Sequence, residues 1–279
     1  MNKLELKKIA NEVRKGIVTS VHSAKAGHPG GSLSAADIYT YLYFVEMNVD
    51  PKEPKKADRD RFVLSKGHTA PGLYAALAHR GFFPVEDLIT LRKVGSYLQG
   101  HPSMKSVPGV DMSTGSLGQG ISVATGMALA NKMDGNPGRV YSVLGDGELD
   151  EGSNWEAAMS AAHYKLTNLI TFVDRNHNMI DGNTEDVMAL EPLADKWEAF
   201  GFIVKKIDGN NIKELCEAID FAYENETDKP VLILCDTVKG CGIDFIEGDF
   251  RWHYGAFDDE KYANGKKSLE NTYAARVAR

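Results

Sequence analysis

The sequence is poor in cysteine and has no long hydrophobic run. Its 279 residues contain 3 cysteines, and none of them forms a Cys-x-x-Cys pair. An odd number of isolated cysteines is typical of reduced thiols that pack in the interior, so we expect no disulfide framework. Residues 1–8 mix charge with leucine too closely for a signal peptide, and no segment approaches the roughly 20 apolar residues that cross a bilayer. We therefore expect a soluble, cytoplasmic protein that does not bind a membrane.

The sequence also lacks an excess of positive charge. Its formal net charge is −7, which argues against nucleic acid as the main partner. Hydrophobic residues make up 43% and charged residues 25%, as in a globular chain large enough for one α/β domain. We see no repeat, low-complexity segment or internal boundary. Residues 1–279 are therefore expected to form a single domain that binds small anions through a metal ion and helix ends.

Short apolar runs alternate with helical patterns along much of the chain. The expected strands are 62–64, 141–144, 169–173, 202–207 and 231–235. The expected helices are about 3–25, 69–79, 121–132, 154–165, 190–200 and 211–225. This alternation predicts an α/β fold, a doubly wound parallel sheet with helices on both faces. Residues 93–117 are rich in Gly, Ser and Pro and are expected to form an active-site loop.

Two helix boundaries are less regular. The Gly-His-Pro-Gly-Gly stretch at 27–31 breaks the first helix, and Ser34 is expected to cap a second helix that begins near Ala35. Residues 255–279 are polar and weakly patterned, and we expect at most a short helix at their end.

Polar side chains follow two neighbouring strands of the predicted sheet. Asp146 lies between two glycines directly after one strand, and Asn176 follows the next strand along the chain. Ligands of parallel α/β sheets bind beyond the carboxyl ends of the strands. Mg²⁺ prefers oxygen ligands and usually takes one or two protein carboxylates, leaving positions for phosphate and water. This arrangement predicts a divalent cation that carries a diphosphate, the alternative being an ordinary strand-to-helix turn.

A glycine-rich segment at 115–120 precedes a helix of small residues. The free amides at the start of that helix can accept an anion or support a cofactor ring. The Gly-x-Gly pattern of residues 118–120 follows no strand and lacks a correctly spaced third glycine, so it does not indicate a dinucleotide site.

Four of the eight histidines, His28, His68, His101 and His253, lie in loops that contain glycine or proline. Imidazoles near a cofactor can move protons close to neutral pH. Taken singly, each is more often a surface or structural histidine than a catalytic one. Their spacing contains no His-x-x-x-His pair that would indicate zinc.

Taken together and in order, these motifs resemble transketolase, a thiamine-diphosphate-dependent family. The similar segments are 26–31, 65–68, 100–102, 114–120, 145–176 and 252–253, which together span nearly the whole chain. The resemblance implies thiamine diphosphate held through Mg²⁺ or Ca²⁺ by Asp146, Asn176 and the backbone carbonyl of Asn178. It also implies transfer of a two-carbon ketol unit from a ketose phosphate to an aldose phosphate, as in the pentose phosphate pathway, with the cofactor stabilising the carbanion.

The resemblance further assigns roles to side chains. His28 and His253 are expected to transfer protons at the C3 hydroxyl of the donor sugar. His101 is expected to orient the C1 hydroxyl, and His68 to lie at the diphosphate end. The expected cofactor contacts are His68, Gly115, Ser116, Leu117, Gly145, Asp146, Gly147, Glu148, Asn176, Lys239 and His253. For Lys239, the sequence leaves open a phosphate contact or a solvent-facing side chain.

The chain has about half the length that the resemblance implies for a complete transketolase. In that family a glutamate on a second, pyrimidine-binding domain activates the cofactor, and most basic residues that grip the sugar phosphate lie there as well. We therefore expect a partner chain with pyrimidine-binding and C-terminal domains, an α2β2 stoichiometry, and no activity of this chain alone.

Several alternatives stay open at the level of sequence. They include the α subunit of a 2-oxo acid dehydrogenase, the front part of deoxyxylulose phosphate synthase, and a related split enzyme for a branched or sulfonated sugar. Residues 26–30 and 65–70 favour transketolase over the first two. A non-catalytic protein that stores or senses thiamine diphosphate would not need the four loop histidines, and a metal-free interaction module would not bind the cofactor.

Overall fold

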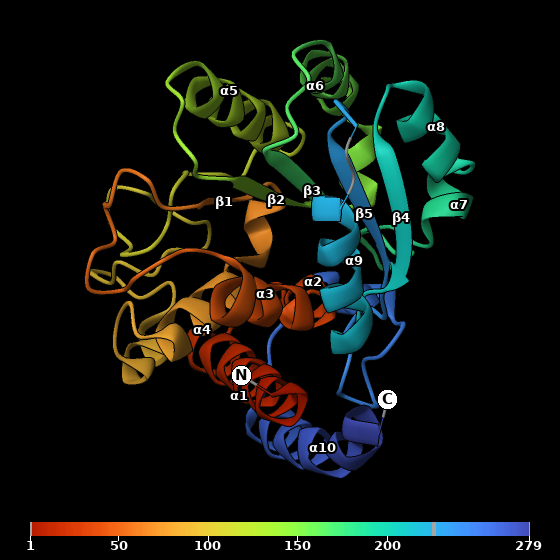
Figure 1. Cartoon of the computed structure of the whole chain (residues 1–279). Helices are drawn as coiled ribbons and strands as arrows, with labels where there is room; N and C mark the ends of the chain where they lie inside the picture. The colour runs from red at the N-terminus through yellow and green to blue at the C-terminus, as the bar shows by residue number, and fades with distance from the viewer. Residues whose placement is uncertain (1, 225–226, 279) are drawn as a thin grey trace.

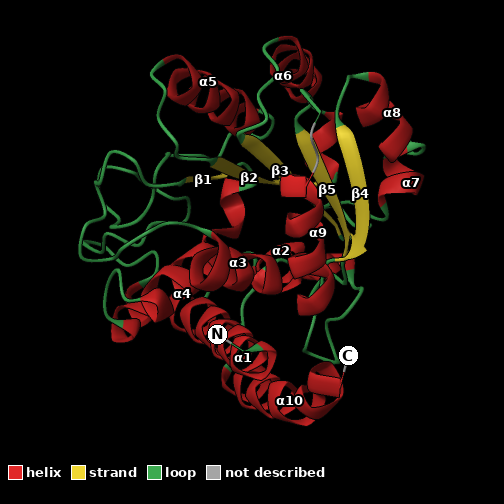
Figure 2. Ribbon diagram, in the orientation of Figure 1, coloured by secondary structure: helices red, strands yellow, loops and turns green. Residues whose placement is uncertain are grey.

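A five-stranded parallel sheet forms the centre of the protein (Figures 1 and 2). The structure is a computed structural model that describes residues 2–224 and 227–278. Its strands are β1 (Arg61–Leu64), β2 (Val140–Gly145), β3 (Leu169–Arg175), β4 (Ile203–Asp208) and β5 (Val231–Asp236). They lie in the order β1-β2-β3-β5-β4, and every neighbouring pair is parallel. The predicted α/β fold with a doubly wound parallel sheet is confirmed.

Helices cover both faces of the sheet. The longer helices are α1 (Lys3–Ala24), α4 (Ala70–Arg80), α5 (Gln119–Met133), α6 (Gly152–His163), α9 (Ile212–Glu224) and α10 (Asp259–Ala278). The shorter ones are α2 (Pro29–Ser34), α3 (Ala36–Tyr41), α7 (Thr184–Val187) and α8 (Leu193–Ala199). In Figure 1, α5 and α6 lie above the sheet and α8 to the right of β4, whereas α1 to α4 and α10 lie below the sheet and α9 lies between β4 and α3. Within the described ranges, none of these helices has the length and apolarity needed to cross a membrane.

The strands divide their side chains between two hydrophobic cores, because successive residues of a strand point to opposite faces. On β5, Val231 and Ile233 belong to the core beneath α1, α3 and α9. Leu232 and Leu234 belong to the core beneath α5, α6 and α8. Burial on both faces explains why the strands appear in the sequence as continuous apolar runs.

The region after α1 differs from expectation. Helix α2 begins at Pro29, directly after His28, since proline at the first helical position lacks only an N–H that would have no partner there. Ser34 ends α2, and its hydroxyl donates to the carboxylate of Asp174 at 2.6 Å. The prediction that Ser34 caps a helix from Ala35 is therefore wrong, because a buried carboxylate from a distant strand takes the hydroxyl.

The C-terminal segment also differs, because residues 259–278 form the 20-residue helix α10 rather than a short helix. It packs along α1, where Lys7 donates to the carbonyl of Val277 at 2.7 Å and Arg276 to the side chain of Asn11 at 2.5 Å. Polar contacts hold much of this helix, so its hydrophobic pattern gives little signal. The other expected helices and strands are present within a few residues, although residue 225 lies outside the described part.

Arg14 joins α1 to α3 and to the segment after β5. Its guanidinium donates to both carboxylate oxygens of Asp37, at 3.0 and 2.5 Å, and to the carbonyl of Cys241 at 3.0 Å. The side chain of Arg14 is 1% exposed. Since both charges are removed from water, each depends on the other.

We expect Arg14→Lys to lower the free energy of unfolding by about 2–4 kcal/mol, because an ammonium cannot reproduce the three-way contact of the guanidinium. Lys15→Arg is the matched control, since Lys15 makes an exposed pair with Glu12 and its replacement should change stability by less than about 0.5 kcal/mol. Urea denaturation measures both. Equal losses in the two variants would contradict a structural role for the buried pair.

Candidate functional site

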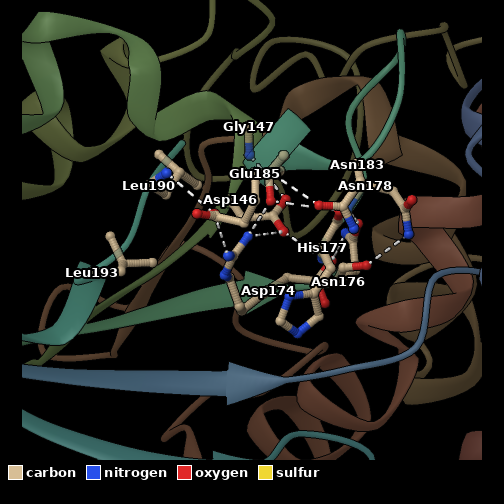
Figure 3. Close-up of polar contacts among 12 residues, drawn as sticks. Asp146, Gly147, Asp174, Asn176, His177, Asn178, Asn183, Glu185, Leu190 and Leu193 are labelled. Atoms are coloured by element: carbon tan, nitrogen blue, oxygen red, sulfur yellow. Dashed lines mark hydrogen bonds and ion pairs between the residues drawn. The ribbon is translucent and has the colours of Figure 1, made fainter. Parts of the chain in front are cut away.

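The candidate site lies beyond the carboxyl ends of β2 and β3 (Figure 3). Asp146 follows β2 directly, and Asn176 follows β3. The Asp146 carboxylate is buried and accepts the backbone N–H groups of Gly147 at 2.9 Å and His177 at 2.6 Å. A cavity of about 270 Å³ opens at this edge of the sheet. The fold therefore places both predicted side-chain metal ligands at one cavity.

The carboxylate of Asp174, near the end of β3, is fully buried and receives four donors. They are the hydroxyls of Ser34 and Thr237 at 2.6 and 2.5 Å, the ammonium of Lys66 at 2.5 Å, and the side-chain amide of Asn176 at 2.9 Å. Burial alone raises the pKa of Asp174, but Lys66 and the hydroxyls outweigh it and hold that pKa below its usual value. Asp174 is thus a charged, fully satisfied anchor.

The contact with Asp174 orients the amide of Asn176. Its nitrogen donates to Asp174, so its oxygen faces the other way and accepts the backbone N–H of Asn178 at 3.2 Å. Asn176 therefore presents an oxygen to its surroundings on the side away from Asp174.

Lys239 is buried at the same edge, with 2% of its surface exposed, so the solvent-facing alternative is wrong. Its ammonium donates to the carbonyl of Asn178 at 2.9 Å and lies 3.3 Å from Nδ1 of His253. Burial lowers the pKa of Lys239 to about 8. The carbonyl that we predicted as the third metal ligand thus already attracts a cation of the protein itself.

Asp146 keeps capacity for a further cation. Its Oδ2 accepts from His177 and lies 3.3 Å from a nitrogen of Arg175, whereas its Oδ1 accepts only the N–H of Gly147 among the described residues. A carboxylate oxygen can accept a second contact. Burial and the neighbouring Asp174 raise the pKa of Asp146, and Arg175 and the N–H donors oppose this. A bound cation would favour the ionised carboxylate in the same way.

Glu148 connects three glycine-containing segments. One carboxylate oxygen accepts the hydroxyl of Ser65 and the N–H of Gly118, and the other accepts the N–H of Gly145 at 2.9 Å. Burial raises the pKa of Glu148, and these donors oppose the rise. Both carboxylate oxygens therefore already accept hydrogen bonds from the protein itself. A direct contact of Glu148 with a cofactor stays a prediction.

His28, His68 and His253 form a cluster beside the cavity. Their ring centroids lie 5.0, 5.4 and 5.1 Å apart, although the residues come from distant parts of the sequence. Burial and neighbouring positive groups lower the pKa of His28 to about 4 and that of His253 to about 3, and the pKa of His68 is also lowered. All three rings are therefore neutral at pH 7. Nδ1 of His28 is buried and has no hydrogen-bond partner within the described part of the chain.

Backbone hydrogen bonds join the loop of His28 to the chain segment that carries His253. The N–H of Gly255 donates to the carbonyl of Gly27 at 2.9 Å, and the N–H of Gly240 donates to the carbonyl of Gly30 at 3.0 Å. A Cβ atom on Gly30 would lie 2.7 Å from the carbonyl oxygen of Trp252. Only glycine permits this approach of the two backbones.

His101, the fourth predicted histidine, lies beside the glycine-rich segment. A Cβ atom on Gly115 would lie 3.0 Å from Cδ2 of His101. The hydroxyl of Tyr74 lies 3.0 and 3.1 Å from the carbonyls of Gln99 and His101 and fixes the loop there. Burial and the charge of Arg92 lower the pKa of His101.

The cavity collects ten of the predicted residues, which are His68, Leu117, Gly145, Asp146, Gly147, Glu148, Asn176, Asn178, Lys239 and His253. Gly115 and Ser116 instead line a neighbouring hollow of about 260 Å³ at the start of α5. A wider depression of about 530 Å³ beyond β4 and β5 is lined by three carboxylates, Asp208, Glu214 and Asp236. Those carboxylates would repel a diphosphate, so the smaller cavity is the better candidate.

Sequence reasoning assigned no role to Lys66, Asp174, Met179 or Ile180. Lys66 follows the buried strand β1 closely, and a lysine at such a position signals that a carboxylate must pair with it. Asp174 lies near the end of β3 in the same sheet and is the partner of Lys66. Met179 and Ile180 add apolar surface to the cavity, and the local sequence carries no signal for that.

Comparison with known proteins identifies the family. Residues 6–275 match the family model described as transketolase, thiamine diphosphate binding domain. The 6-deoxy-6-sulfo-D-fructose transketolase subunit SqwG of Clostridium sp. (strain MSTE9) is 46% identical over 267 residues, which cover 96% of this chain and 97% of that protein. An apulose-4-phosphate transketolase subunit of Phocaeicola vulgatus is 45% identical, with 95% and 93% covered.

Longer transketolases match over part of their length. Human transketolase is 41% identical over 89% of this chain but only 39% of the human protein. The solved transketolase of Pichia stipitis in complex with sedoheptulose 7-phosphate has a TM-score of 0.86 and 33% identity, covering 99% of this chain and 44% of that one. The chain thus spans less than half of these proteins. Fold and family match define a thiamine-diphosphate-binding domain, and the chain belongs to the transketolase family.

We expect stability to fall as the pH drops from 6.5 toward 4. His28 and His253 titrate near 6.5 when unfolded but near 4 and 3 when folded, so in this range the unfolded chain binds more protons and folding is weakened. Protonation of each histidine in the unfolded chain should lower the free energy of unfolding by about 1–3 kcal/mol at pH 4.5. Urea denaturation at pH 7 and pH 4.5 measures the loss, which should be smaller in a His28→Asn, His253→Asn double variant. An unchanged pH dependence in that variant would refute the assignment.

We expect Gly30→Ala to separate the loops of His28 and His253, because the new methyl group would overlap the carbonyl of Trp252. The pKa values of both histidines, followed by NMR, should rise toward 6.5 as their burial is lost. Gly126→Ala in α5 is the control, since nothing lies within 4 Å of a Cβ atom there. Unmoved histidine pKa values in Gly30→Ala would show that this close approach does not build the cluster.

Proposed function

We propose that the chain is the thiamine-diphosphate-binding subunit of a two-subunit transketolase. It would transfer a two-carbon ketol unit from a ketose phosphate to an aldose phosphate. One observation carries the proposal: a cluster of neutral, partly buried histidines lies beside the strand ends that present Asp146 and Asn176. An anion site next to neutral proton acceptors suits a reaction of sugar phosphates that moves protons between hydroxyl groups.

The strand-end residues fit Mg²⁺ or Ca²⁺ with a diphosphate. Asp146 has spare acceptor capacity, Asp174 fixes the amide of Asn176, and the carbonyl of Asn178 attracts the ammonium of Lys239. The aspartate, the asparagine side chain and this carbonyl would be the three protein ligands, and Lys239 would turn to the phosphate charge once a metal takes the carbonyl. When bound, thiamine diphosphate supplies the carbanion stabilisation that protein side chains lack.

The histidines supply the proton transfers. Nδ1 of His28 is buried without a partner among the described residues, which supports an acceptor role toward a sugar hydroxyl. We assign proton transfer at the C3 hydroxyl to His28 and His253, orientation of the C1 hydroxyl to His101, and the diphosphate end to His68. Phosphate groups entering the site would raise the low pKa values of His28 and His253 toward neutrality, because negative charge favours the imidazolium form.

A partner chain would complete the site. Two relatives of nearly the same length are named as subunits, and the chain covers only 39% of human transketolase. Exposed apolar side chains lie beside the cavity: Ile180 lines it at 59% exposure, and Tyr254, at 50%, packs against His28. We propose that a chain with pyrimidine-binding and C-terminal domains covers them and supplies the missing glutamate, in an α2β2 assembly.

Two classes of sugar substrate are candidates. An ordinary pentose phosphate pair is one. A sulfonated or branched sugar is the other, because relatives at 46% and 45% identity are named for 6-deoxy-6-sulfo-D-fructose and apulose 4-phosphate. Product analysis with xylulose 5-phosphate and with both unusual sugars as donors separates the two candidates.

The function is tested on the complex captured with this chain, with thiamine diphosphate and Mg²⁺ present. We expect ketol transfer from one of the donors by the complex and none by the chain alone. His28→Ala should lower kcat by at least about 100-fold and leave thiamine diphosphate affinity nearly unchanged. Ketol transfer by the chain alone, or full activity of His28→Ala, would contradict the proposal.

A further inference from the structure

Arg175, the last residue of β3, uses both ends of its guanidinium at the strand-end site. The residue is 3% exposed and lies between Asp174 and Asn176 in the chain. Its Nη1 lies 3.3 Å from Oδ2 of Asp146 and donates to the hydroxyl of Thr184 at 2.5 Å. One side chain therefore joins a predicted metal ligand to the segment that follows β3.

The segment 177–184, called the metal loop below, presents the third predicted ligand. The N–H of Thr184 donates to the carbonyl of His177 at 2.9 Å, which closes the base of the loop. Within the loop, Asn178 forms an antiparallel bridge with Asn183. The carbonyl of Asn178 thus lies in a closed turn, and the guanidinium is attached at the base of that turn.

The other end of the guanidinium fixes the chain that follows the metal loop. Nη2 of Arg175 donates to the carboxylates of Glu185 and Glu191 at 2.8 and 3.2 Å. Glu185 also accepts the N–H groups of Leu190 at 3.1 Å and Glu191 at 3.3 Å (Figure 3). Only a planar fork with several donors can serve such a set of acceptors at once.

The position of Arg175 is electrostatically unexpected for a cation site. A positive charge beside Asp146 repels a metal ion bound to the same carboxylate, so attraction of the metal cannot explain it. Its contact instead engages Oδ2, together with the N–H of His177, and leaves Oδ1 with the single donor Gly147 among the described residues. The contact therefore contributes to geometry: it occupies Oδ2 of Asp146 and leaves Oδ1 with capacity for a further ligand.

We propose that Arg175 is a positioning residue of the metal site, which fixes the metal loop to Asp146 and thereby sets the affinity of the chain for the divalent cation. This inference rests on the proposed function, because it names what holds the proposed ligands in register. The side chain itself does not touch the metal. It acts through Asp146 on one side and through Thr184 and the carbonyl of Asn178 on the other.

The test measures the affinity of the captured complex for Mn²⁺ by EPR of the free ion, with thiamine diphosphate present. Arg175→Gln should weaken Mn²⁺ binding about 10–100-fold, as loss of a residue that orients metal ligands does. The direction of the change in Mn²⁺ affinity distinguishes a positioning role from a purely electrostatic one. If Arg175 acted through its charge alone, its removal would strengthen Mn²⁺ binding, because a repelling cation is lost. Tighter or unchanged binding in Arg175→Gln would therefore overturn the inference.

Two further variants separate positioning from loss of folding. Arg175→Lys keeps the charge but loses the fork, and should also weaken Mn²⁺ binding, by about 5–50-fold. Glu185→Gln leaves the contact of Arg175 with Asp146 in place and loosens only the chain after the metal loop, so its loss should be smaller than that of Arg175→Lys. Lys213→Gln is the control, since its exposed pair with Glu217 lies on α9, and Mn²⁺ affinity should change less than about 2-fold.

Activity at increasing metal concentration supplies a readout that a general loss of structure would not move. With saturating Mn²⁺, kcat of Arg175→Lys should return to within about 3-fold of the wild type, because the metal itself draws the ligands together. A kcat that stays low at every metal concentration would place the defect elsewhere and contradict a positioning role.

The same measurements separate failure of this inference from failure of the proposed function. If the complex binds Mn²⁺ in an Arg175-dependent way but catalyses no ketol transfer, the positioning role stands and the reaction is wrong. If the complex is active and Mn²⁺ affinity does not depend on Arg175, the inference fails alone. If the wild-type complex binds no Mn²⁺, both the metal site and the role of Arg175 are overturned.

Discussion

The buried ion pair between Asp174 and Lys66 holds the candidate site together. Lys66 follows β1 and Asp174 lies near the end of β3. The other donors to this carboxylate are Ser34 of α2, Thr237 after β5 and Asn176 directly after β3. One carboxylate therefore fixes four segments at the carboxyl edge of the sheet. Losing either charge would leave the other buried and unpaired, at a cost of about 3–5 kcal/mol. The orientation of Asn176, and with it the proposed metal site, depends on this pair.

The same pair separates the roles of two neighbouring carboxylates. The negative charge of Asp174 is balanced by Lys66 within the protein, whereas Asp146 keeps an oxygen with spare acceptor capacity. Lys66 and Lys239 add positive charge behind the cavity and contribute to the low pKa of His253. The chain by itself thus places neutral imidazoles close to two buried lysines, and in the proposed function negative charge from a cofactor and substrate would favour protonation of these imidazoles. The proposed strand-end ligands, the histidine cluster and the buried lysines thus lie close enough together to influence one another electrostatically.

Sequence reasoning reached the parts that local pattern encodes. Continuous apolar runs indicated the strands, and Asp146 and Asn176 were found because parallel strands end at one edge. The same reasoning missed the contact of Ser34 with Asp174 and the burial of Lys239, because both depend on segments distant in sequence that meet only in the fold.

The sequence did not predict two further features, helix α10 and the role proposed for Arg175, for related reasons. Helix α10 was missed since polar contacts with α1, rather than an apolar stripe, hold much of it. Arg175 stands between two residues that the pattern singled out, yet its own partners come partly from a loop whose path no local pattern predicts. Residues proposed to bind the metal were thus easier to find from the sequence than residues proposed to hold them in place.

The central claim is that the strand ends bind a metal that carries a diphosphate. Anomalous diffraction from crystals of the captured complex, grown with thiamine diphosphate and Mn²⁺, tests it most directly. We expect one anomalous peak in direct coordination with Asp146, Asn176 and the carbonyl of Asn178, with the ammonium of Lys239 displaced from that carbonyl. Cofactor density with the metal at another place, or with Lys239 still bonded to Asn178 and no metal beside it, would contradict the account.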